Sequence, residues 1–150
     1  MNHINFQLVT PEKKVLKREL VSLTCPTTLG EITILPHHIP LVAELKAGEL
    51  HAKTEKEDFY LHIGGGFVQI KPGSEVVVLA DAAEHHYEID EKRALEAKER
   101  AEKVMAQTSK TSPDYAKVAV SLERSLTRLN VARKHANKNI SNLNSGTFKE

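Results

Sequence analysis

The sequence predicts a mixed β then α fold, with an N-terminal antiparallel β-sandwich or barrel followed by a C-terminal antiparallel hairpin of two helices. The first observation is a change in the spacing of apolar residues between Ala80 and Ala101, from every second position to about every 3.6 positions. The second is that glycine, proline and charged turns divide the preceding part into short segments. We therefore expect a sandwich over residues 1–87, a hairpin over residues 88–137 and a polar, disordered tail over residues 138–150.

The first part consists of short alternating segments that are typical of half-buried strands. Ile4, Phe6 and Leu8 alternate with other residues until Thr10 and Pro11 end the run. Segments of the same kind cover residues 21–25, 32–34, 50–52, 59–63, 67–70 and 75–79. Their spacing favours an antiparallel sandwich or barrel.

Two glycine-containing segments separate predicted strands. Residues 71–74 read Lys-Pro-Gly-Ser, in which proline presets one central φ and glycine accepts a positive one, so they predict a tight turn. The three consecutive glycines at 64–66 lack the spacing of a nucleotide-binding loop, and a strand rather than a helix follows them. They predict a bulge or a close approach of two backbones.

The first helix is predicted to begin at Glu91, because Asp90 is a suitable N-cap. The residues on one face of this helix, which is expected to end at Thr108, are mostly alanine: Ala94, Ala97, Ala101, Val104 and Met105. Alanines bury little apolar area, at roughly 25 cal/mol for each Å². We therefore expect a weakly held hairpin that can detach while the sandwich stays folded.

The second helix is predicted to begin at the sequence Ser112-Pro113-Asp114, which combines a capping residue, a proline at the first helical position and an early acidic side chain. Its apolar residues recur at spacings of four and three, as in a helix that lies along a partner: Tyr115, Ala119, Leu122, Leu126 and Leu129.

The formal net charge of +1 conceals an asymmetry between the two parts. Before Tyr87 there are 8 basic and 11 acidic residues, and from Tyr87 onward there are 13 basic and 9 acidic residues. One basic series contains no intervening acidic residue: Arg124, Arg128, Arg133, Lys134 and Lys138. Such a series suits an acidic partner, or it complements the dipole at the end of a solvated helix.

The sequence also limits the compartment in which the chain works. No apolar run approaches the roughly 18 residues that a membrane-spanning helix needs. The N-terminal residues lack a basic stretch followed by an apolar one, so we expect no secretion signal. Cys25 is the only cysteine and forms no internal disulfide, so we expect a reducing compartment, most simply the bacterial cytoplasm.

Several strings along residues 3–135 resemble, in the same order, the epsilon subunit of the rotary F-type ATP synthase, called delta in mitochondria. They are VTPE at 9–12, LGEITILPHHIPL at 29–41, GGGFV at 64–68, VLADAA at 78–83 and IDEKRA at 89–94. The resemblance implies a non-catalytic central-stalk subunit of a proton-translocating enzyme, peripheral on the cytoplasmic face of the bacterial plasma membrane. Its sandwich would bind the gamma subunit and rest on the ring of c subunits.

The loop from Gly30 to His38 is similar to the surface with which the family faces that ring. The resemblance implies ring contacts for Glu31 and His38, whose position between strands makes their side chains available to a partner. Alternatively, His37 and His38 are simply solvated. The family resemblance further implies a mobile hairpin that restrains ATP hydrolysis when it extends toward the alpha and beta subunits.

Some bacterial members of that family bind ATP to the folded hairpin, through a motif present here at 89–94. The ATP site implied by this resemblance comprises Glu84, Ile89, Asp90, Arg93, Ala94, Arg100, Arg124 and Arg128. Folding of the hairpin would bring arginine-bearing faces close, and guanidinium groups match phosphate oxygens well. Alternatively, Asp90 is only an N-cap and the arginines pair with Glu96, Glu99 or Glu123. No cofactor is required, and ATP would be a regulatory ligand.

Two other classes of function remain as alternatives. A standalone metal-binding enzyme would use His37 and His38, or His85 and His86 with nearby carboxylates at Asp81, Glu84 or Glu88. The sequence contains no HExxH, CxxC or GxSxG motif, so we expect no metal site and no catalytic residue. An adaptor with a basic helix would bind nucleic acid, but no aromatic residues are interleaved with its Lys and Arg residues. We expect no nucleic acid and a membrane only through the complex.

Overall fold

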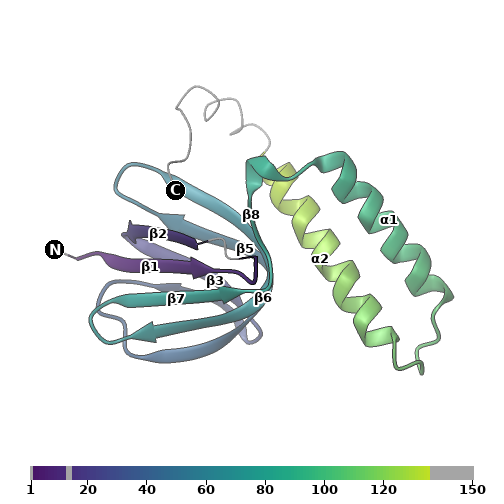
Figure 1. Cartoon of the computed structure of the whole chain (residues 1–150), viewed down its shortest axis with the longest axis horizontal. Helices are drawn as coiled ribbons and strands as arrows, with labels where there is room; N and C mark the ends of the chain where they lie inside the picture. The colour runs from purple at the N-terminus through teal and green to yellow at the C-terminus, as the bar shows by residue number, and fades with distance from the viewer. Residues whose placement is uncertain (1, 13–14, 136–150) are drawn as a thin grey trace.

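The computed structural model describes residues 2–12 and 15–135, which form a β-domain followed by two antiparallel helices (Figure 1). The predicted tail at 138–150 and the basic residue Lys138 lie outside the described residues. The strands are β1 (Ile4–Val9), β2 (Val15–Leu20), β3 (Ser22–Thr27), β4 (Gly30–Ile34), β5 (Leu41–Lys53), β6 (Asp58–Lys71), β7 (Glu75–Ala80) and β8 (Ala83–His85). The helices are the short 3₁₀ turn η1 (His86–Glu88), α1 (Glu91–Gln107) and α2 (Tyr115–Lys134).

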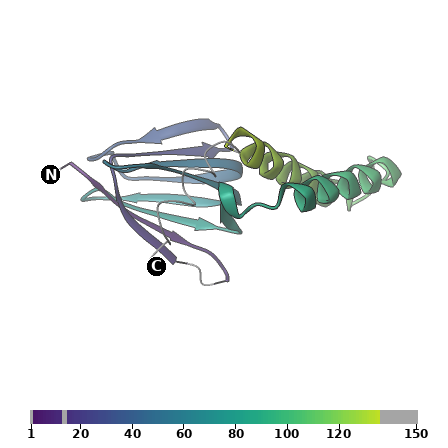
Figure 2. The ribbon, with the colours of Figure 1, turned by 90° about the horizontal axis from the view of Figure 1, so that it is seen from above.

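The strands form one sheet in the order β2-β1-β7-β6-β5-β3-β4, and β8 pairs with β6. Every pairing among the described strands is antiparallel except that of β1 with β7, which is parallel. The sheet folds over so that its strands lie in two layers (Figure 2). This arrangement confirms the predicted sandwich, with a sheet that is not closed into a barrel.

In the long strands β5 and β6, the alternating set of positions that faces the core switches from one set to the other where the sheet bends. Leu61 and Ile63 face the core before the three glycines, whereas Val68 and Ile70 face it after them. The pairing of Leu45 with Gly66 is followed directly by that of Ala47 with Gly64, so one pair is missing from the ladder but the register does not shift. Of the two alternatives predicted for residues 64–66, the structure therefore shows the close approach of two backbones and not a bulge, since a Cβ at Gly66 would lie 1.9 Å from the Leu79 carbonyl oxygen. Strand β6 runs through the glycines without a break, so the prediction of two separate strands there was wrong.

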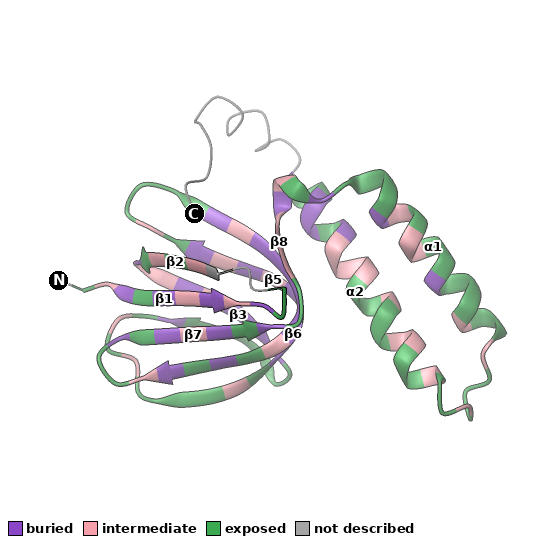
Figure 3. Cartoon of the chain, viewed as in Figure 1, coloured by how far each residue is buried: buried purple, intermediate pink, exposed green. Residues whose placement is uncertain are grey.

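The core of the sandwich is built from residues of both its layers, and buried positions, coloured purple in Figure 3, recur along the strands. Its largest fully buried side chains are Ile4, Leu20, Leu23, Ile34, Leu50, Ile63, Val68, Val76, Val78 and Cys25. Strand β2 was not predicted, because its charged residues Lys17, Arg18 and Glu19 obscure the pattern of a strand at the edge of the sheet. Strand β8, which is only three residues long, was not predicted either.

The hairpin begins where it was predicted to begin. The Asp90 carboxylate accepts a hydrogen bond from the Arg93 amide at 3.2 Å, so Asp90 is the N-cap of α1. Ala94 and Ala101 are buried, but Val104 is 48 % exposed and was wrongly placed on the packed face. Val104 lies roughly 80° around the helix from Ala94, at the margin of the contact with α2.

The second helix begins later than predicted. Residues 112–114 form a turn, in which the Ser112 hydroxyl accepts from the Asp114 amide and the Ser112 carbonyl accepts from the Tyr115 amide. These local bonds replace the capping of a helix starting at Pro113, so α2 begins at Tyr115.

Candidate functional site

The hairpin meets the sandwich on one outward face of β5, β6 and β8, which we call the docking face. Cross-strand pairing places Glu49, His62 and Glu84 in one row, and it places His51 beside Tyr60 in the next. Because side chains alternate along a strand, the neighbouring Leu61 and Ile63 point into the core while this set points outward. Helix α2 lies over these strands, and α1 lies on the far side of α2 (Figure 1).

Oppositely charged side chains join α2 to the sandwich. The Arg128 guanidinium binds both carboxylate oxygens of Glu84, through Nε to Oε1 and through Nη2 to Oε2 at 3.1 Å. Arg124 Nη2 lies 3.2 Å from Asp81 Oδ2, and Lys134 Nζ lies 3.2 Å from Glu49 Oε2. The acidic sandwich and the basic helix are therefore matched, and the Arg128 pair, with both side chains less than one-third exposed, is the best shielded of the three.

Histidines occupy the centre and the end of this interface. His62 is 4 % exposed, and its Nε2 is hydrogen-bonded to the Thr127 hydroxyl of α2 at 2.8 Å. Burial lowers the pKa of His62 to about 4; Glu84 opposes this shift, whereas Arg128 and Arg124 reinforce it. At the end of α2, the His135 ring stacks on Tyr60 with 3.8 Å between centroids, and its Nε2 lies 3.1 Å from Glu49 Oε1.

The apolar clusters of the two domains are separate. The hairpin has its own small cluster of Ile89, Ala94, Leu129, Val131 and Ala132, with Leu95 packed against it. The sandwich core contains none of these residues. Within the described part of the chain, polar contacts thus carry much of the attachment of the hairpin to the sandwich.

Comparison with family models identifies both domains. Residues 3–86 match the β-sandwich domain of the ATP synthase delta/epsilon chain, and residues 88–133 match the long α-helix domain of the same chain. The chain belongs to the ATP synthase delta/epsilon family. Members of this family are non-catalytic stalk subunits, so this chain is a subunit of ATP synthase that does not carry the catalytic site. Neither alternative class of function is supported.

Curated relatives of this family member extend over nearly its whole length. An ATP synthase epsilon chain of Dehalococcoides mccartyi is 44 % identical over 134 residues, which cover 89 % of this chain and 95 % of the relative. The epsilon chain of Halalkalibacterium halodurans is 41 % identical over 130 residues, covering 87 % and 96 % of the two chains. That of Geobacter sulfurreducens is 38 % identical over 135 residues, covering 90 % and 97 %.

Solved structures show the same fold. A chain in the structure of the Euglena gracilis mitochondrial ATP synthase matches with a TM-score of 0.73 at 22 % identity, covering 90 % of this chain and 81 % of that one. A chain from the central stalk and c-ring of the Tetrahymena thermophila enzyme matches with a TM-score of 0.52 at 16 % identity, covering 91 % and 96 %.

The residues expected to bind ATP in this delta/epsilon chain are distributed over three places. Glu84, Arg124 and Arg128 belong to the docking interface, where Arg124 and Arg128 pair with Asp81 and Glu84. Ile89 and Ala94 are buried in the hairpin cluster. On the exposed side of α1, Asp90 caps the helix, Arg93 lies 3.6 Å from Asp90, and Arg100 faces solvent. Sequence reasoning identified the cap but not the partners Asp81 and Glu84.

The residues expected to contact the ring lie at two ends of β4. Glu31 is exposed near the start of this edge strand. His38 follows the strand in the loop, where its Nδ1–H donates to the Ile39 carbonyl at 2.6 Å. Exposed apolar side chains at the same two ends, Leu29 and Ile39, give a partner apolar surface to contact.

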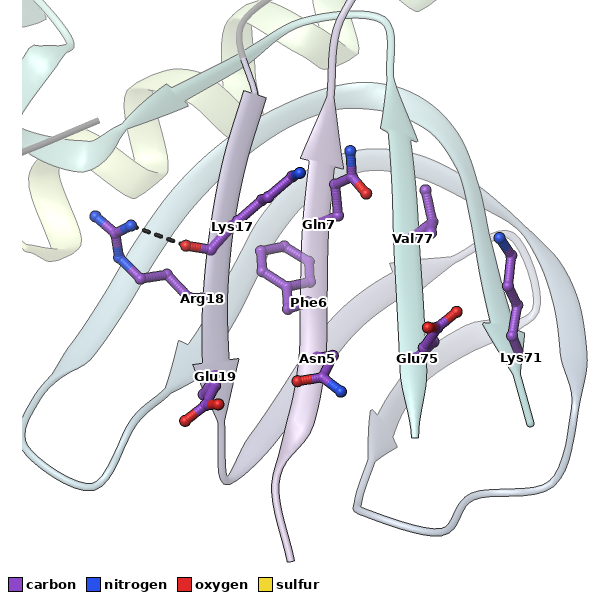
Figure 4. Close-up of a pocket in the computed structure, with 9 residues that line it drawn as sticks. All are labelled: Asn5, Phe6, Gln7, Lys17, Arg18, Glu19, Lys71, Glu75 and Val77. Atoms are coloured by element: carbon purple, nitrogen blue, oxygen red, sulfur yellow. Dashed lines mark hydrogen bonds between the residues drawn. The ribbon is translucent and has the colours of Figure 1, made fainter. Parts of the chain in front are cut away.

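Described residues line grooves on the sandwich and along its contact with α2, two of which bear on the site. One, of about 470 Å³, follows the end of α2 and is lined by Thr24, Glu31, Glu49, His51, Tyr60, Lys134 and His135. The other, of about 580 Å³, lies over β1, β2 and β7 on the part of the sheet shown in Figure 4. Its cationic residues Lys17, Arg18 and Lys71 are interspersed with Glu19 and Glu75, so it offers no uniform charge to a ligand.

The histidine pairs do not assemble a metal centre. Among residues 2–12 and 15–135, no three His, Cys, Asp or Glu side chains gather as a metal would require. The same part of the chain contains no helix that is both long and apolar enough to span a membrane.

Proposed function

We propose that the chain is the central-stalk rotor subunit of a bacterial proton-translocating F-type ATP synthase, peripheral on the cytoplasmic face of the plasma membrane. Its sandwich binds the gamma subunit and rests on the c-ring, and its hairpin regulates ATP hydrolysis. Family membership and the bacterial epsilon chains among its relatives support the first part.

The polar docking interface carries the regulatory part of this proposal. The hairpin is attached to the sandwich by ion pairs and hydrogen bonds, and the two domains have separate apolar clusters. Because exposed ion pairs contribute little free energy, docking is reversible while both domains keep their own structure. Release also exposes the basic side chains of α2, Arg124, Arg128 and Lys134, to acidic surfaces of the alpha and beta subunits.

Truncation of the hairpin in the assembled enzyme tests this role. Deleting residues 108–150 removes α2 and is expected to raise the ATPase activity of the complex without preventing assembly. A chain lacking only residues 138–150 is the matched control and should hydrolyse ATP at the full-length rate. Unchanged hydrolysis by a complex that contains the longer deletion would contradict the inhibitory role.

We extend the proposal to direct ring contacts by Glu31 and His38. Both side chains lie beside exposed apolar residues at the ends of β4, as a protein contact requires. Cysteine at either position is expected to cross-link to a cysteine on the polar loop of a c subunit in the assembled enzyme. Cysteine at Lys110, in the turn between the helices, is the control. Equal cross-linking yields at all three positions would contradict the assignment.

We also propose that ATP is a regulatory ligand of the docked hairpin. The arginines at 124 and 128 are bound to Asp81 and Glu84, so phosphate oxygens must compete with these carboxylates or use the exposed Arg93 and Arg100. Calorimetric titration with Mg-ATP is expected to show binding that the Arg93→Ala, Arg128→Ala double variant loses. Arg133→Ala is the matched control. No binding at millimolar ATP would leave the coupling role intact and remove ATP sensing.

A further inference from the structure

Buried histidines are concentrated where the hairpin meets the sandwich. In the described part of the chain, the buried polar side chains are Thr10, Thr27, Ser74, His62, His86 and His135. The three histidines all lie at the docking interface: His62 on β6, His86 in η1 and His135 at the end of α2. A buried imidazole is stable in its neutral form, so an interface that covers histidines is sensitive to protonation.

His62 is covered by α2 itself. Its Nε2 bonds to the Thr127 hydroxyl, which in turn donates to the Arg124 carbonyl one turn earlier in the helix. Its Nδ1 lies 3.9 Å from Glu84 Oε1, and the Glu84 carboxylate is already bound by Arg128. A proton on His62 would therefore be buried beneath two arginines and beside a carboxylate whose charge Arg128 neutralises.

We propose that the docking of the hairpin is controlled by pH, and that protonation of His62 under α2 releases the hairpin from the sandwich. The groups that face His62 come from every element packed on it: Glu49 from β5, Glu84 from β8, and Arg124, Arg128 and Thr127 from α2. The proposal concerns docking in the chain itself, so it can fail or succeed independently of any effect of the hairpin on ATP hydrolysis.

The sign of the effect follows from the two states of His62. In the docked state its pKa is lowered to about 4, whereas after release the ring meets water and its pKa returns toward the ordinary value of about 6.5. A base with a lowered pKa stabilises docking fully above pH 6.5, and this contribution is lost as pH falls toward 4. Between pH 7.5 and pH 5.5 the docking equilibrium constant should fall about tenfold.

The other histidine contacts at the interface do not all act in the same direction. His135 faces Glu49, whose charge favours a proton on the His135 ring, whereas the burial of that ring opposes one. His86 donates to the Tyr60 carbonyl, and His51 lies 3.3 Å from Asp58 within the sandwich. The Glu49→Gln variant removes the attraction between His135 and Glu49. The same variant also weakens docking by removing the partner of Lys134, so that the docked and the released hairpin are both populated enough to observe.

Energy transfer between two dyes measures docking directly. Cysteines replace the exposed residues Thr28 in the β3–β4 turn and Lys110 between the helices, in the full chain carrying Glu49→Gln. Cys25 is buried and its pKa is raised to about 12, so it does not compete for the dyes. The efficiency of energy transfer should change between pH 7.5 and pH 5.5, following the tenfold decrease in the docking equilibrium constant. Circular dichroism over the same range should show that the helices persist.

His62→Gln is the decisive variant, because glutamine keeps a hydrogen-bonding side chain toward Thr127 but does not titrate. It should abolish most of the pH dependence of transfer, whatever its docking at pH 7.5, whereas the control His3→Gln, at a residue paired with Glu55, should keep the pH dependence. Constant transfer across the pH range, or the same midpoint in His62→Gln, would overturn the proposal. So would an NMR titration of His62 in the unsubstituted chain with a pKa near 6.5, a measurement that needs no variant to fold.

Discussion

At the scale of single residues, Gly66 determines how closely β6 approaches β7. Its φ of +141° is one that residues with a side chain rarely adopt, and a Cβ there would lie 1.9 Å from the Leu79 carbonyl oxygen. Because the obstacle is backbone, no rotamer change relieves the clash. The three glycines at 64–66 are thus explained by the shape of the sandwich rather than by a bound phosphate.

Gly66→Ala is expected to destabilise the sandwich by more than about 3 kcal/mol, from the combined effects of backbone strain and overpacking. Thermal unfolding followed by circular dichroism measures the change. Gly73→Ala is the control, because Gly73 also has a positive φ, of +83°, but a Cβ there would meet no atom within 4 Å. Gly73→Ala should lower the free energy of unfolding by only about 1 kcal/mol. Equal effects of the two substitutions would show that conformation alone, and not the approach to Leu79, matters.

Arg128 is the residue of α2 for which we expect the largest contribution to docking. Its side chain is 31 % exposed and that of Glu84 is 24 % exposed, so Arg128→Ala leaves a carboxylate without its partner in a partly buried position. We expect docking to weaken by about 1–3 kcal/mol, measured with the dye pair at 28 and 110. Arg133→Ala is the control, because its pair with Glu91 is about half exposed and within the hairpin, and should change docking by less than about 0.5 kcal/mol. Equal losses in the two variants would disprove the special role of Glu84.

These partners explain why the sequence predicted the cap but not the ion pairs. Asp90 and Arg93 are three residues apart, so helix geometry alone relates them. Arg124 and Arg128 find Asp81 and Glu84 more than 40 positions away, on a face that exists only after β8 has paired with β6. The pairing suggested with Glu96, Glu99 or Glu123 considered only neighbours on the helices, and the structure gives Arg124 and Arg128 other partners.

At the scale of elements, the sequence was most informative where the apolar pattern was regular. The alternation in β1 and β7 and the helical repeat of α1 were recognised, because one face of each element is buried. β2 was missed because it is a charged edge strand, and the start of α2 was misplaced because the Ser112 turn bonds satisfy the groups that a cap would bind. Local hydrogen bonding and edge position are not encoded in apolar periodicity.

The N-cap of α1 gives a test at this scale that also separates two roles of Asp90. Asp90→Ala should destabilise the hairpin by about 1 kcal/mol, because the Arg93 amide loses its acceptor. Asp90→Asn keeps an oxygen acceptor and should be nearly neutral. Hydrogen exchange at the amides of residues 93–97 measures the difference. If both variants exchange like the original chain, the carboxylate has no capping role and its use in the ATP motif becomes the better explanation.

At the scale of the whole molecule, the unequal charges of the two parts have a structural explanation. The acidic residues Asp81, Glu84 and Glu49 of the sandwich meet basic residues of α2 in three ion pairs. This complementarity accounts for three members of the basic series, Arg124, Arg128 and Lys134, as a docking surface, which composition alone left open. The same charges make docking dependent on ionic strength, since the Debye length falls from about 10 Å at 0.1 M salt to about 3 Å at 1 M.

Raising the salt concentration from 0.1 M to 1 M is therefore expected to lower the docking constant roughly tenfold, if the three pairs each lose a few tenths of a kcal/mol. The dye pair at 28 and 110 measures docking at pH 7.5, where His62 is neutral in both states. The Arg124→Gln, Lys134→Gln variant, which lacks the two more exposed pairs, should respond less steeply because only the shielded Arg128 pair remains. The free energy of unfolding of the sandwich, whose core is apolar, should not be lowered by salt. Docking that is equally strong at both salt concentrations would instead assign the attachment to the apolar contacts of α2, and attachment by charge would then lose its physical basis.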